Sequence, residues 1–225
     1  MTAECALTTG SDWGRSLDDL LEVMEGCWRL WKGFCGSGGI VASLVHPGII
    51  GAGSDLFAQR SVSRVYVAAS TGCFPELSFP EVIEILNDLE FTAVEIVLDD
   101  GGQQLTASQL VDNFEESIRL IRDTHRLDIC SYNVKIEGEG EQYYTRFEKV
   151  CDLAKATKVV TLTIPSAVHG TPFNQEVEHL QRLVAIADLR GVRIGIKSQI
   201  GCLTEDPDTV KNLCDYVPGV GLTLD

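Results

Sequence analysis

The sequence predicts an α/β protein whose main domain is a (β/α) barrel of the TIM type, with about six of the eight strands of such a barrel present. One observation is a regular alternation, from residue 63 onward, of short apolar runs with longer amphipathic segments. This alternation is typical of βα units. A second observation is that the later apolar runs carry small or polar residues on one face, which suits a barrel lumen. Residues 63–225 are therefore expected to form the barrel domain.

The expected strands are the apolar runs, which are bounded by turn-forming residues. They cover residues 64–70, 93–100, 127–136, 159–165, 192–198 and 219–225. The amphipathic segments between them are expected to be helices, at 78–90, 108–125, 140–156, 174–190 and 206–217. Ser78 and Pro80 mark the beginning of the first helix as its cap and a first-turn residue. Because each helix returns the chain to the same edge, the sheet is expected to be parallel.

The faces of the last strands distinguish two parallel architectures, an open doubly wound sheet and a closed barrel. Ile194 and Ile196 share one face of their strand, whereas Gly195 and Lys197 share the other. An open sheet that is covered by helices on both sides needs apolar residues on both faces. The barrel is therefore favoured over the open sheet.

Residues 1–62 differ in composition from the rest of the chain and are expected to form an irregular N-terminal extension. They contain all three tryptophans and ten of the 21 glycines. Apolar residues recur at helical spacing between Ser16 and Trp31, so one amphipathic helix is expected there. A glycine-rich connector follows it. No chemistry is assigned to this extension.

Composition restricts the classes of partner. The formal net charge of −15 opposes binding to a phosphate backbone, so no nucleic-acid partner is expected. No apolar run approaches the roughly 18 residues that a membrane-spanning helix needs, and the N-terminus lacks the pattern of a secretory signal. The eight cysteines form no C-x-x-C pair, which favours buried thiols in a reducing compartment. We therefore expect a cytoplasmic protein without a membrane partner.

Three stretches carry a resemblance to a known family. They are "ELSFPEVIEILNDLEFTAVEI", the last 35 residues "GVRIGIKSQIGCLTEDPDTVKNLCDYVPGVGLTLD" and, more weakly, "VVTLTIPSAVHGTPF". The segment from about residue 65 to residue 225 resembles the xylose isomerase-like TIM barrel superfamily, which includes sugar phosphate isomerases and epimerases. The resemblance implies a small-molecule partner, a sugar or sugar phosphate.

The resemblance also implies a divalent metal, Mn²⁺, Mg²⁺, Co²⁺ or Zn²⁺, held at the carboxyl ends of the strands by Glu, Asp, His and Glu. In such a site the metal polarises a ketose carbonyl while carboxylates move a proton between carbons. Asp225 matches one metal ligand, Lys197 stands where the first ligand is expected, and the last two ligand positions fall after residue 225. This departure puts the metal site in doubt and predicts a C-terminally incomplete barrel.

Lys197 has three interpretations from the sequence. It forms a structural ion pair with Asp225 on the neighbouring strand, it binds the carboxylate or phosphate of a substrate, or it is a Schiff-base amine of the aldolase type. The last role requires a lowered pKa, which neighbouring acids oppose.

Other polar residues are also candidates for the site. If their shared face of the strand is luminal, Glu95 is a candidate catalytic proton carrier or acceptor for ring hydroxyls, and Asp99 is a second candidate. Asp99 and Asp100 alternatively form only a turn before two glycines. His169, in the loop after the fourth strand, and Gln199, at the end of the fifth, are candidate substrate-binding residues.

The first functional hypothesis is a sugar or sugar-phosphate isomerase or epimerase that transfers a proton next to a carbonyl, with Glu95 and Lys197 catalytic and Asp225 a metal ligand. The alternatives are a non-catalytic, truncated barrel fragment and a lysine-dependent aldolase or lyase. A barrel of six strands would also leave the edges of its first and last strands open, which favours self-association.

Overall fold

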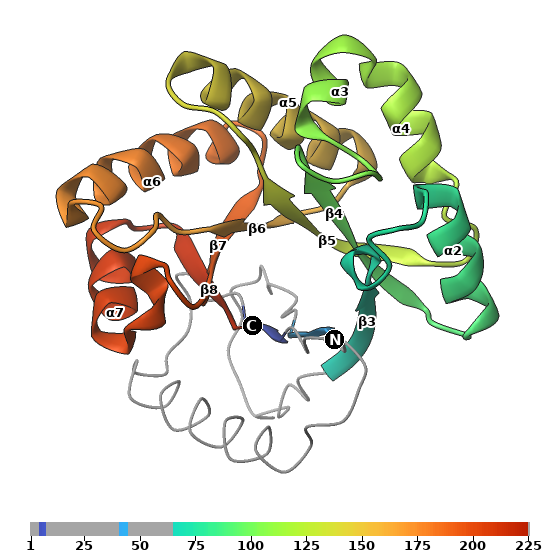
Figure 1. Cartoon of the computed structure of the whole chain (residues 1–225), viewed down its shortest axis with the longest axis horizontal. Helices are drawn as coiled ribbons and strands as arrows, with labels where there is room; N and C mark the ends of the chain where they lie inside the picture. Colours follow the sequence, from blue (N-terminus) through green and yellow to red (C-terminus); the bar gives the residue numbers. More distant parts are fainter. Residues whose placement is uncertain (1–4, 8–40, 45–64, 225) are drawn as a thin grey trace, which may run out of the picture.

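Six parallel strands and the helices between them make up most of the protein. The computed structural model describes residues 5–7, 41–44 and 65–224 (Figure 1). Each strand pairs in parallel with the next along the chain, from β3 to β8. Their bounds are Val65–Ser70 (β3), Ala93–Asp99 (β4), Asp128–Lys135 (β5), Thr161–Pro165 (β6), Arg193–Lys197 (β7) and Val220–Leu224 (β8). The six predicted strands and their parallel order are therefore confirmed.

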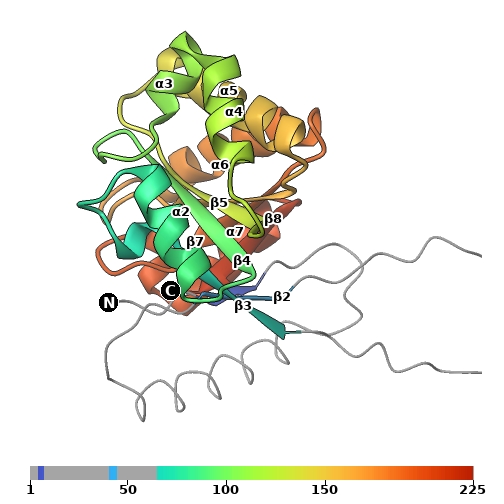
Figure 2. The ribbon, with the colours of Figure 1, turned by 90° about the vertical axis from the view of Figure 1, so that its right-hand side faces the viewer.

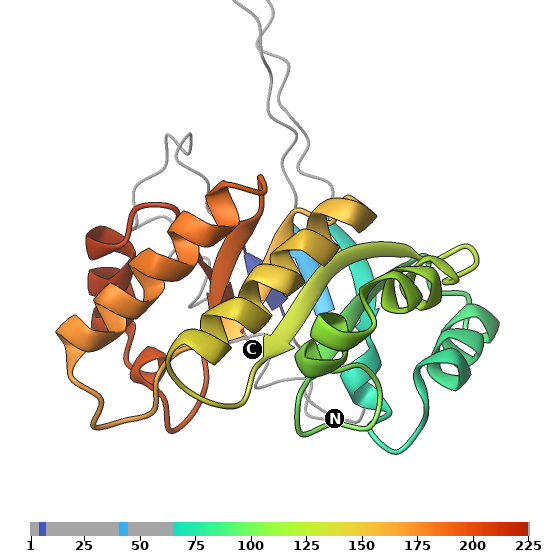
Figure 3. The same cartoon turned by 90° about the horizontal axis from the view of Figure 1, so that it is seen from above.

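The helices lie on the outer side of the curved sheet (Figures 1 and 2). They are α2 (Phe79–Asp88), α3 (Ala107–Asp112), α4 (Phe114–Arg122), α5 (Glu141–Thr157), α6 (Phe173–Asp188) and α7 (Pro207–Tyr216), with short 3₁₀ helices η1 (Thr71–Cys73) and η2 (Leu203–Glu205). Helices α5 and α6 lie side by side over the sheet (Figure 3). No helix in the described part of the chain is long and apolar enough to cross a membrane.

The segment predicted as one helix, 108–125, is two helices. Asn113 separates α3 from α4, with φ −134° and ψ 52°, which is not helical. Its backbone N–H donates to the carbonyl of Gln109 and ends α3. Asparagine is unfavourable in the interior of a helix, although the Asn113 side chain makes no capping hydrogen bond to α4.

Two short strands from the N-terminal extension complete the order of strands as a closed barrel, β1 to β8. Strand β1 (Cys5–Leu7) runs antiparallel to β8, and β2 (Val41–Leu44) runs antiparallel to β3. The two short strands are parallel to each other. The expectation that the edges of β3 and β8 are open is therefore wrong. Open strand edges thus give no reason to expect self-association. The predicted helix between Ser16 and Trp31 lies outside the described residues.

The main core lies between the sheet and the helices. On β4, Val94, Ile96 and Leu98 are fully buried and face the helices, whereas Glu95 between them faces the lumen. The other elements complete this core with side chains such as Leu86, Phe147, Leu162, Leu180, Ile194 and Leu213. This burial of the outer face is what the alternation of βα units predicts.

The lumen is narrow and polar around Gly195. The hydroxyls of Thr163 on β6 and Thr223 on β8 lie 3.2 Å apart, across the strand that contains Gly195. A Cβ atom at Gly195 would lie 2.5 Å from the Thr223 hydroxyl oxygen, which is closer than atoms pack. The absence of a side chain at residue 195 thus lets the two threonines meet. The small, polar inner face that predicted a barrel is confirmed at this strand.

We expect Gly195→Ala to lower the free energy of unfolding by about 1–3 kcal/mol, because the added methyl group overpacks the lumen. Urea unfolding of the full chain measures this change. Thr223→Ala removes the obstructing hydroxyl, so the double variant Gly195→Ala/Thr223→Ala should be more stable than the sum of the two single changes predicts. Strictly additive effects would contradict the contact between residues 195 and 223.

Candidate active site

Glu95 is the buried carboxylate of the lumen. Its side chain is 1% exposed, and its Oε1 atom accepts a hydrogen bond from the Ser131 hydroxyl at 3.1 Å. The two residues face each other across the β4–β5 pair. A buried carboxylate that accepts a hydrogen bond from a neighbouring strand is held in one orientation, which a proton carrier requires. Glu95 therefore lies on the inner face, which its predicted role as a proton carrier requires, and that role stays a prediction.

Ser131 is a site residue that sequence reasoning missed, and a β-bulge is the reason. Val94 pairs with Ile129, and Glu95 pairs with Ser131, so Cys130 is an extra residue on β5. Simple alternation would place Ile129 and Ser131 on one face, but the bulge places Ser131 inside and leaves Ile129 packed on the main core. Tyr132 and Val134 are buried although simple alternation would place them on the face opposite to Ile129. This change in the alternation of apolar residues was the sign of a bulge in the sequence.

Lys197 ends β7 at the mouth of the barrel and is half-buried. The register pairs it with Pro165 on β6 and Thr223 on β8. The next backbone N–H, of Ser198, donates to the Thr223 carbonyl at 2.8 Å. The strand's alternation directs Lys197 to the same side as Gly195, the lumen side. Asp225 lies outside the described residues, so its pairing with Lys197 and its role as a metal ligand stay predictions.

His169 and Gln199 lie in the two loops that follow β6 and β7. The His169 Nε2 atom is 2.9 Å from a carboxylate oxygen of Glu205, and both side chains are exposed. The Gly201 N–H and the His169 imidazole hold the pKa of the Glu205 carboxyl below its usual value. Gln199 is exposed, and its backbone carbonyl accepts from the N–H of Cys202 at 3.2 Å. The structure thus brings His169 to Glu205, a pairing that the sequence did not suggest.

The same two loops are joined by backbone hydrogen bonds into one unit, which we call the rim ladder (residues 166–169 and 201–204). Val168 and Cys202 form an antiparallel bridge. The N–H of His169 donates to the Gly201 carbonyl at 2.9 Å, and the N–H of Leu203 donates to the Ala167 carbonyl at 2.8 Å. The loops after β6 and β7 therefore hold each other in place at the mouth.

Glu176, in the first turn of α6, is hydrogen-bonded to the backbone of this rim ladder. Its side chain is 2% exposed, and its Oε1 atom accepts from the Ala167 N–H at 2.9 Å. Burial raises the pKa of the Glu176 carboxyl, although the hydrogen bond from Ala167 opposes the shift. In the sequence Glu176 looks like a solvated helix residue. Its position four residues before the buried Leu180, on the apolar face of α6, was the available signal.

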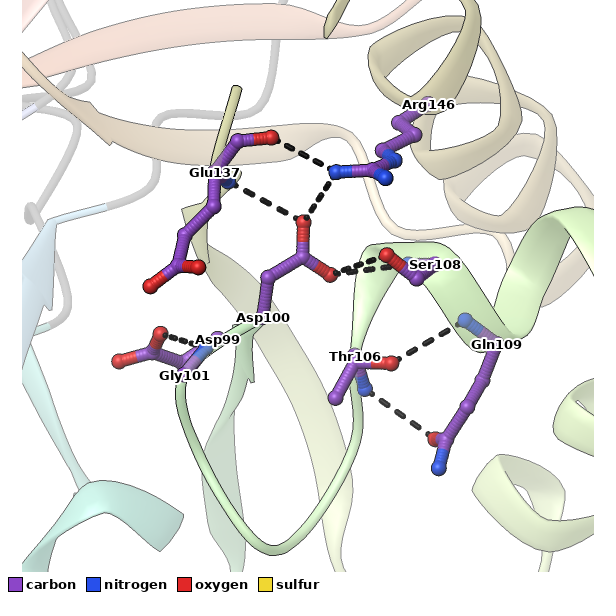
Figure 4. Close-up of polar contacts among 8 residues, drawn as sticks. All are labelled: Asp99, Asp100, Gly101, Thr106, Ser108, Gln109, Glu137 and Arg146. Atoms are coloured by element: carbon purple, nitrogen blue, oxygen red, sulfur yellow. Dashed lines mark hydrogen bonds and ion pairs between the residues drawn. The ribbon is translucent and has the colours of Figure 1, made fainter. Parts of the chain in front are cut away.

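Asp100, after β4, is a structural residue (Figure 4). Its Oδ1 atom accepts from the backbone N–H and the hydroxyl of Ser108 at 2.9 and 3.0 Å. Its Oδ2 atom accepts from the N–H of Glu137 at 3.1 Å and from Arg146 at 3.3 Å. Asp100 thereby joins the loops after β4 and β5 to α3 and α5.

Asp99 accepts a hydrogen bond from the Gly101 N–H at 2.9 Å and lies 3.3 Å from Lys135 Nζ (Figure 4 shows the bond to Gly101). This bond to an N–H two residues ahead is the pattern of an Asx-turn. The turn-forming interpretation of Asp99 and Asp100 is therefore the one that their contacts support.

The described residues do not by themselves form a metal site. Among residues 5–7, 41–44 and 65–224, no group of three or more His, Cys, Asp and Glu side chains is placed to hold a metal ion. The position that the resemblance assigns to the first ligand holds the ammonium of Lys197, which repels a cation. The donor set of the described residues therefore does not fit the metal that the resemblance implies.

We expect Asp100→Asn to lower the free energy of unfolding by about 1–3 kcal/mol, because the amide NH₂ would face donors where a carboxylate oxygen now accepts. Urea unfolding of the full chain measures the change. Asp112→Asn, at the exposed end of α3, is the matched control and should change the free energy of unfolding by less than about 0.5 kcal/mol. Equal effects of the two substitutions would contradict the structural role of Asp100.

Glu176 predicts a pH dependence of stability. Because its pKa is raised in the folded protein, the folded state binds more protons than the unfolded state between the two pKa values. The contribution of Glu176 to stability is therefore present at low pH and is lost as the pH rises through the folded pKa. We expect wild-type stability, measured relative to Glu176→Gln by urea unfolding, to decrease from pH 4 to pH 7. A relative stability that rises over this range would contradict the prediction.

Comparison with known proteins finds no matching family profile and no matching curated protein. Solved structures do match. The probable 3-DHS dehydratase AsbF from Bacillus anthracis is 14% identical over 69% of this chain and 61% of that chain, with a TM-score of 0.54. A xylose isomerase-like TIM barrel protein from Mycobacterium smegmatis, in complex with magnesium, is 15% identical over 63% and 54%, with a TM-score of 0.52. A D-tagatose 3-epimerase-like protein is 16% identical over 69% and 63%, with a TM-score of 0.51.

The chain thus spans less than two thirds of the length of each of these proteins, between 54% and 63%. At these identities the similarity concerns the fold. The chain has the fold of the xylose isomerase-like TIM barrels.

Proposed function

We propose that the protein binds a small sugar or sugar phosphate at the mouth of the barrel and moves a proton at the carbon next to its carbonyl. The observation that carries this proposal is the position of Glu95. Its carboxylate is buried on the lumen face and oriented by the Ser131 hydroxyl. A positioned carboxylate within reach of a substrate C–H bond is the group that such a proton transfer needs.

Glu95 and Lys197 have different roles in the proposed reaction. The Glu95 carboxylate takes the proton from the carbon next to the carbonyl, and the electron pair of the C–H bond moves onto the carbonyl oxygen. The Lys197 ammonium, on the same inner face at the strand end, stabilises the negative charge on that oxygen. Of the three interpretations of Lys197 from the sequence, this role corresponds to substrate binding.

A single acid–base group, Glu95, suits isomerisation better than epimerisation. Glu95 can return the proton to the neighbouring carbon on the same face of the intermediate, while the hydroxyl proton moves to the former carbonyl oxygen. Aldose and ketose are interconverted by this route with one acid–base group. Inversion at a single carbon would need a second proton donor on the opposite face.

The structural neighbours support a small oxygenated substrate. One is named as a 3-DHS dehydratase and another as a D-tagatose 3-epimerase-like protein. Dehydration and epimerisation next to a carbonyl both begin with the loss of a proton from carbon, which is the step proposed for Glu95. At identities of 14% and 16% these neighbours share the fold, and Glu95 and Lys197 of this chain carry the proposed activity.

We expect the full chain, incubated in D₂O with a panel of aldoses, ketoses and their phosphates, to catalyse incorporation of deuterium at the carbon next to the carbonyl. NMR of the sugar measures the exchange, with and without added Mn²⁺ or Mg²⁺. Glu95→Gln should lower the exchange rate by about 10²–10⁴-fold, because the amide cannot accept the proton. Ser131→Ala should have a smaller effect in the same direction.

Glu84→Gln, on the exposed side of α2, is the matched control and should exchange at the wild-type rate. Circular dichroism and urea unfolding establish that each variant is folded. The absence of exchange by the wild-type chain with every sugar and each metal would overturn the proposed function. Wild-type exchange by folded Glu95→Gln would overturn the role of Glu95.

A further inference from the structure

The peptide unit between Lys197 and Ser198 is held from two sides. The Thr204 hydroxyl oxygen lies 2.6 Å from the backbone carbonyl oxygen of Lys197. The N–H of the same peptide unit, from Ser198, donates to the Thr223 carbonyl at 2.8 Å. The strand end that carries the Lys197 side chain is therefore fixed by the rim ladder on one side and by β8 on the other.

The direction of the protons in this contact follows from the chemistry of the groups. A backbone carbonyl can only accept, so the Thr204 hydroxyl donates its proton to Lys197. The Ser166 hydroxyl lies 2.9 Å from the Thr204 hydroxyl and must then donate to it. Ser166 in turn accepts from the Thr204 N–H at 3.2 Å. A directed chain thus runs from Ser166 through Thr204 to the carbonyl of Lys197.

Both hydroxyls of this hydrogen-bond chain are buried. Ser166 is 5% exposed and Thr204 is 3% exposed, so water does not readily replace either hydroxyl. A buried acceptor that loses its donor is destabilised by desolvation, and the backbone around it moves to recover a partner. Ser166 directly follows β6, whereas Thr204 lies in η2, in the loop between β7 and α7. The hydrogen bonds between them therefore connect two βα loops.

We propose that Thr204 is a positioning residue that fixes the Lys197 ammonium in the mouth of the barrel, with Ser166 orienting the Thr204 hydroxyl. The proposal rests on the proposed function, in which Lys197 stabilises the charge on the substrate oxygen. Rotation about the last backbone bonds of β7 would redirect the long Lys197 side chain, and Thr204 and Thr223 together prevent it. A displacement of about 1 Å at such a group can lower a reaction rate by about 10²-fold.

The experiment uses two readouts on the full chain. The first is NMR of protein whose lysines carry ¹³C-methyl groups, in which the Lys197 signal is identified by its loss in Lys197→Arg. The second is kcat and KM for the exchange reaction with unmodified protein. We expect Thr204→Val, which keeps the shape and removes the hydroxyl, to shift the Lys197 signal and to lower kcat about 10- to 100-fold with a smaller change in KM. Thr204→Ser should restore both.

Thr145→Val is the matched control, because the Thr145 hydroxyl also donates to a backbone carbonyl, that of Glu141, but on an exposed turn of α5. It should leave the Lys197 signal and kcat unchanged. If Thr204→Val fails to fold, Ser166→Ala tests the same chain and should shift the Lys197 signal in the same direction.

The two proposals fail in different ways. An unchanged Lys197 signal in folded Thr204→Val, or in Ser166→Ala where the first variant does not fold, would overturn the positioning role of Thr204. A shifted signal with an unchanged kcat would support the positioning of Lys197 but overturn its role in the proposed reaction. A Lys197 signal that shifts in Thr204→Val, together with a wild-type protein that catalyses no exchange, would support the positioning role and overturn the proposed function.

Discussion

The narrowness of the lumen is the constraint on which the site depends. Strands that curve into a barrel bury their inner faces against one another, so side chains there must be small or must find polar partners. Gly195 provides the space in which Thr163 and Thr223 meet, and Ser131 provides a partner for Glu95. The outer face has no such restriction. Ile194, Ile196 and the corresponding residues on the other strands need only apolar contacts with the helices. The polar chemistry of the protein is therefore confined to one side of each strand.

The mouth of the barrel is organised by hydrogen bonds between neighbouring loops rather than by any single loop. Asp100 ties the loop after β4 to the loop after β5, and the rim ladder ties the loop after β6 to the loop after β7. In both places a buried or partly buried acid supports the arrangement, Asp100 in one and Glu176 in the other. Loops that share hydrogen bonds in this way present the strand-end side chains on a rigid frame, as a site for a small substrate requires.

The sequence predicted the fold more completely than the site because apolar periodicity is a local signal and side-chain contacts are not. The strands from β3 to β8 and the lumen side of Gly195 follow from alternation alone. The break at Asn113 was missed because the apolar pattern continues across it. Glu95 was identified, but Ser131 was not, since the extra residue Cys130 shifts the alternation of β5. The pairing of His169 with Glu205 joins residues 36 positions apart, which no local pattern reveals.

The bulge on β5 also links thiol chemistry to the lumen. The Cys130 thiol donates a hydrogen bond to the backbone carbonyl of Val94 at 3.3 Å, at the residue that immediately precedes Glu95. Alkylation or oxidation of this sulfur would remove the donor and add bulk beside the strand that carries the carboxylate. A modification of Cys130 would thus disturb Glu95 through the backbone, at a distance from the strand-end side chains.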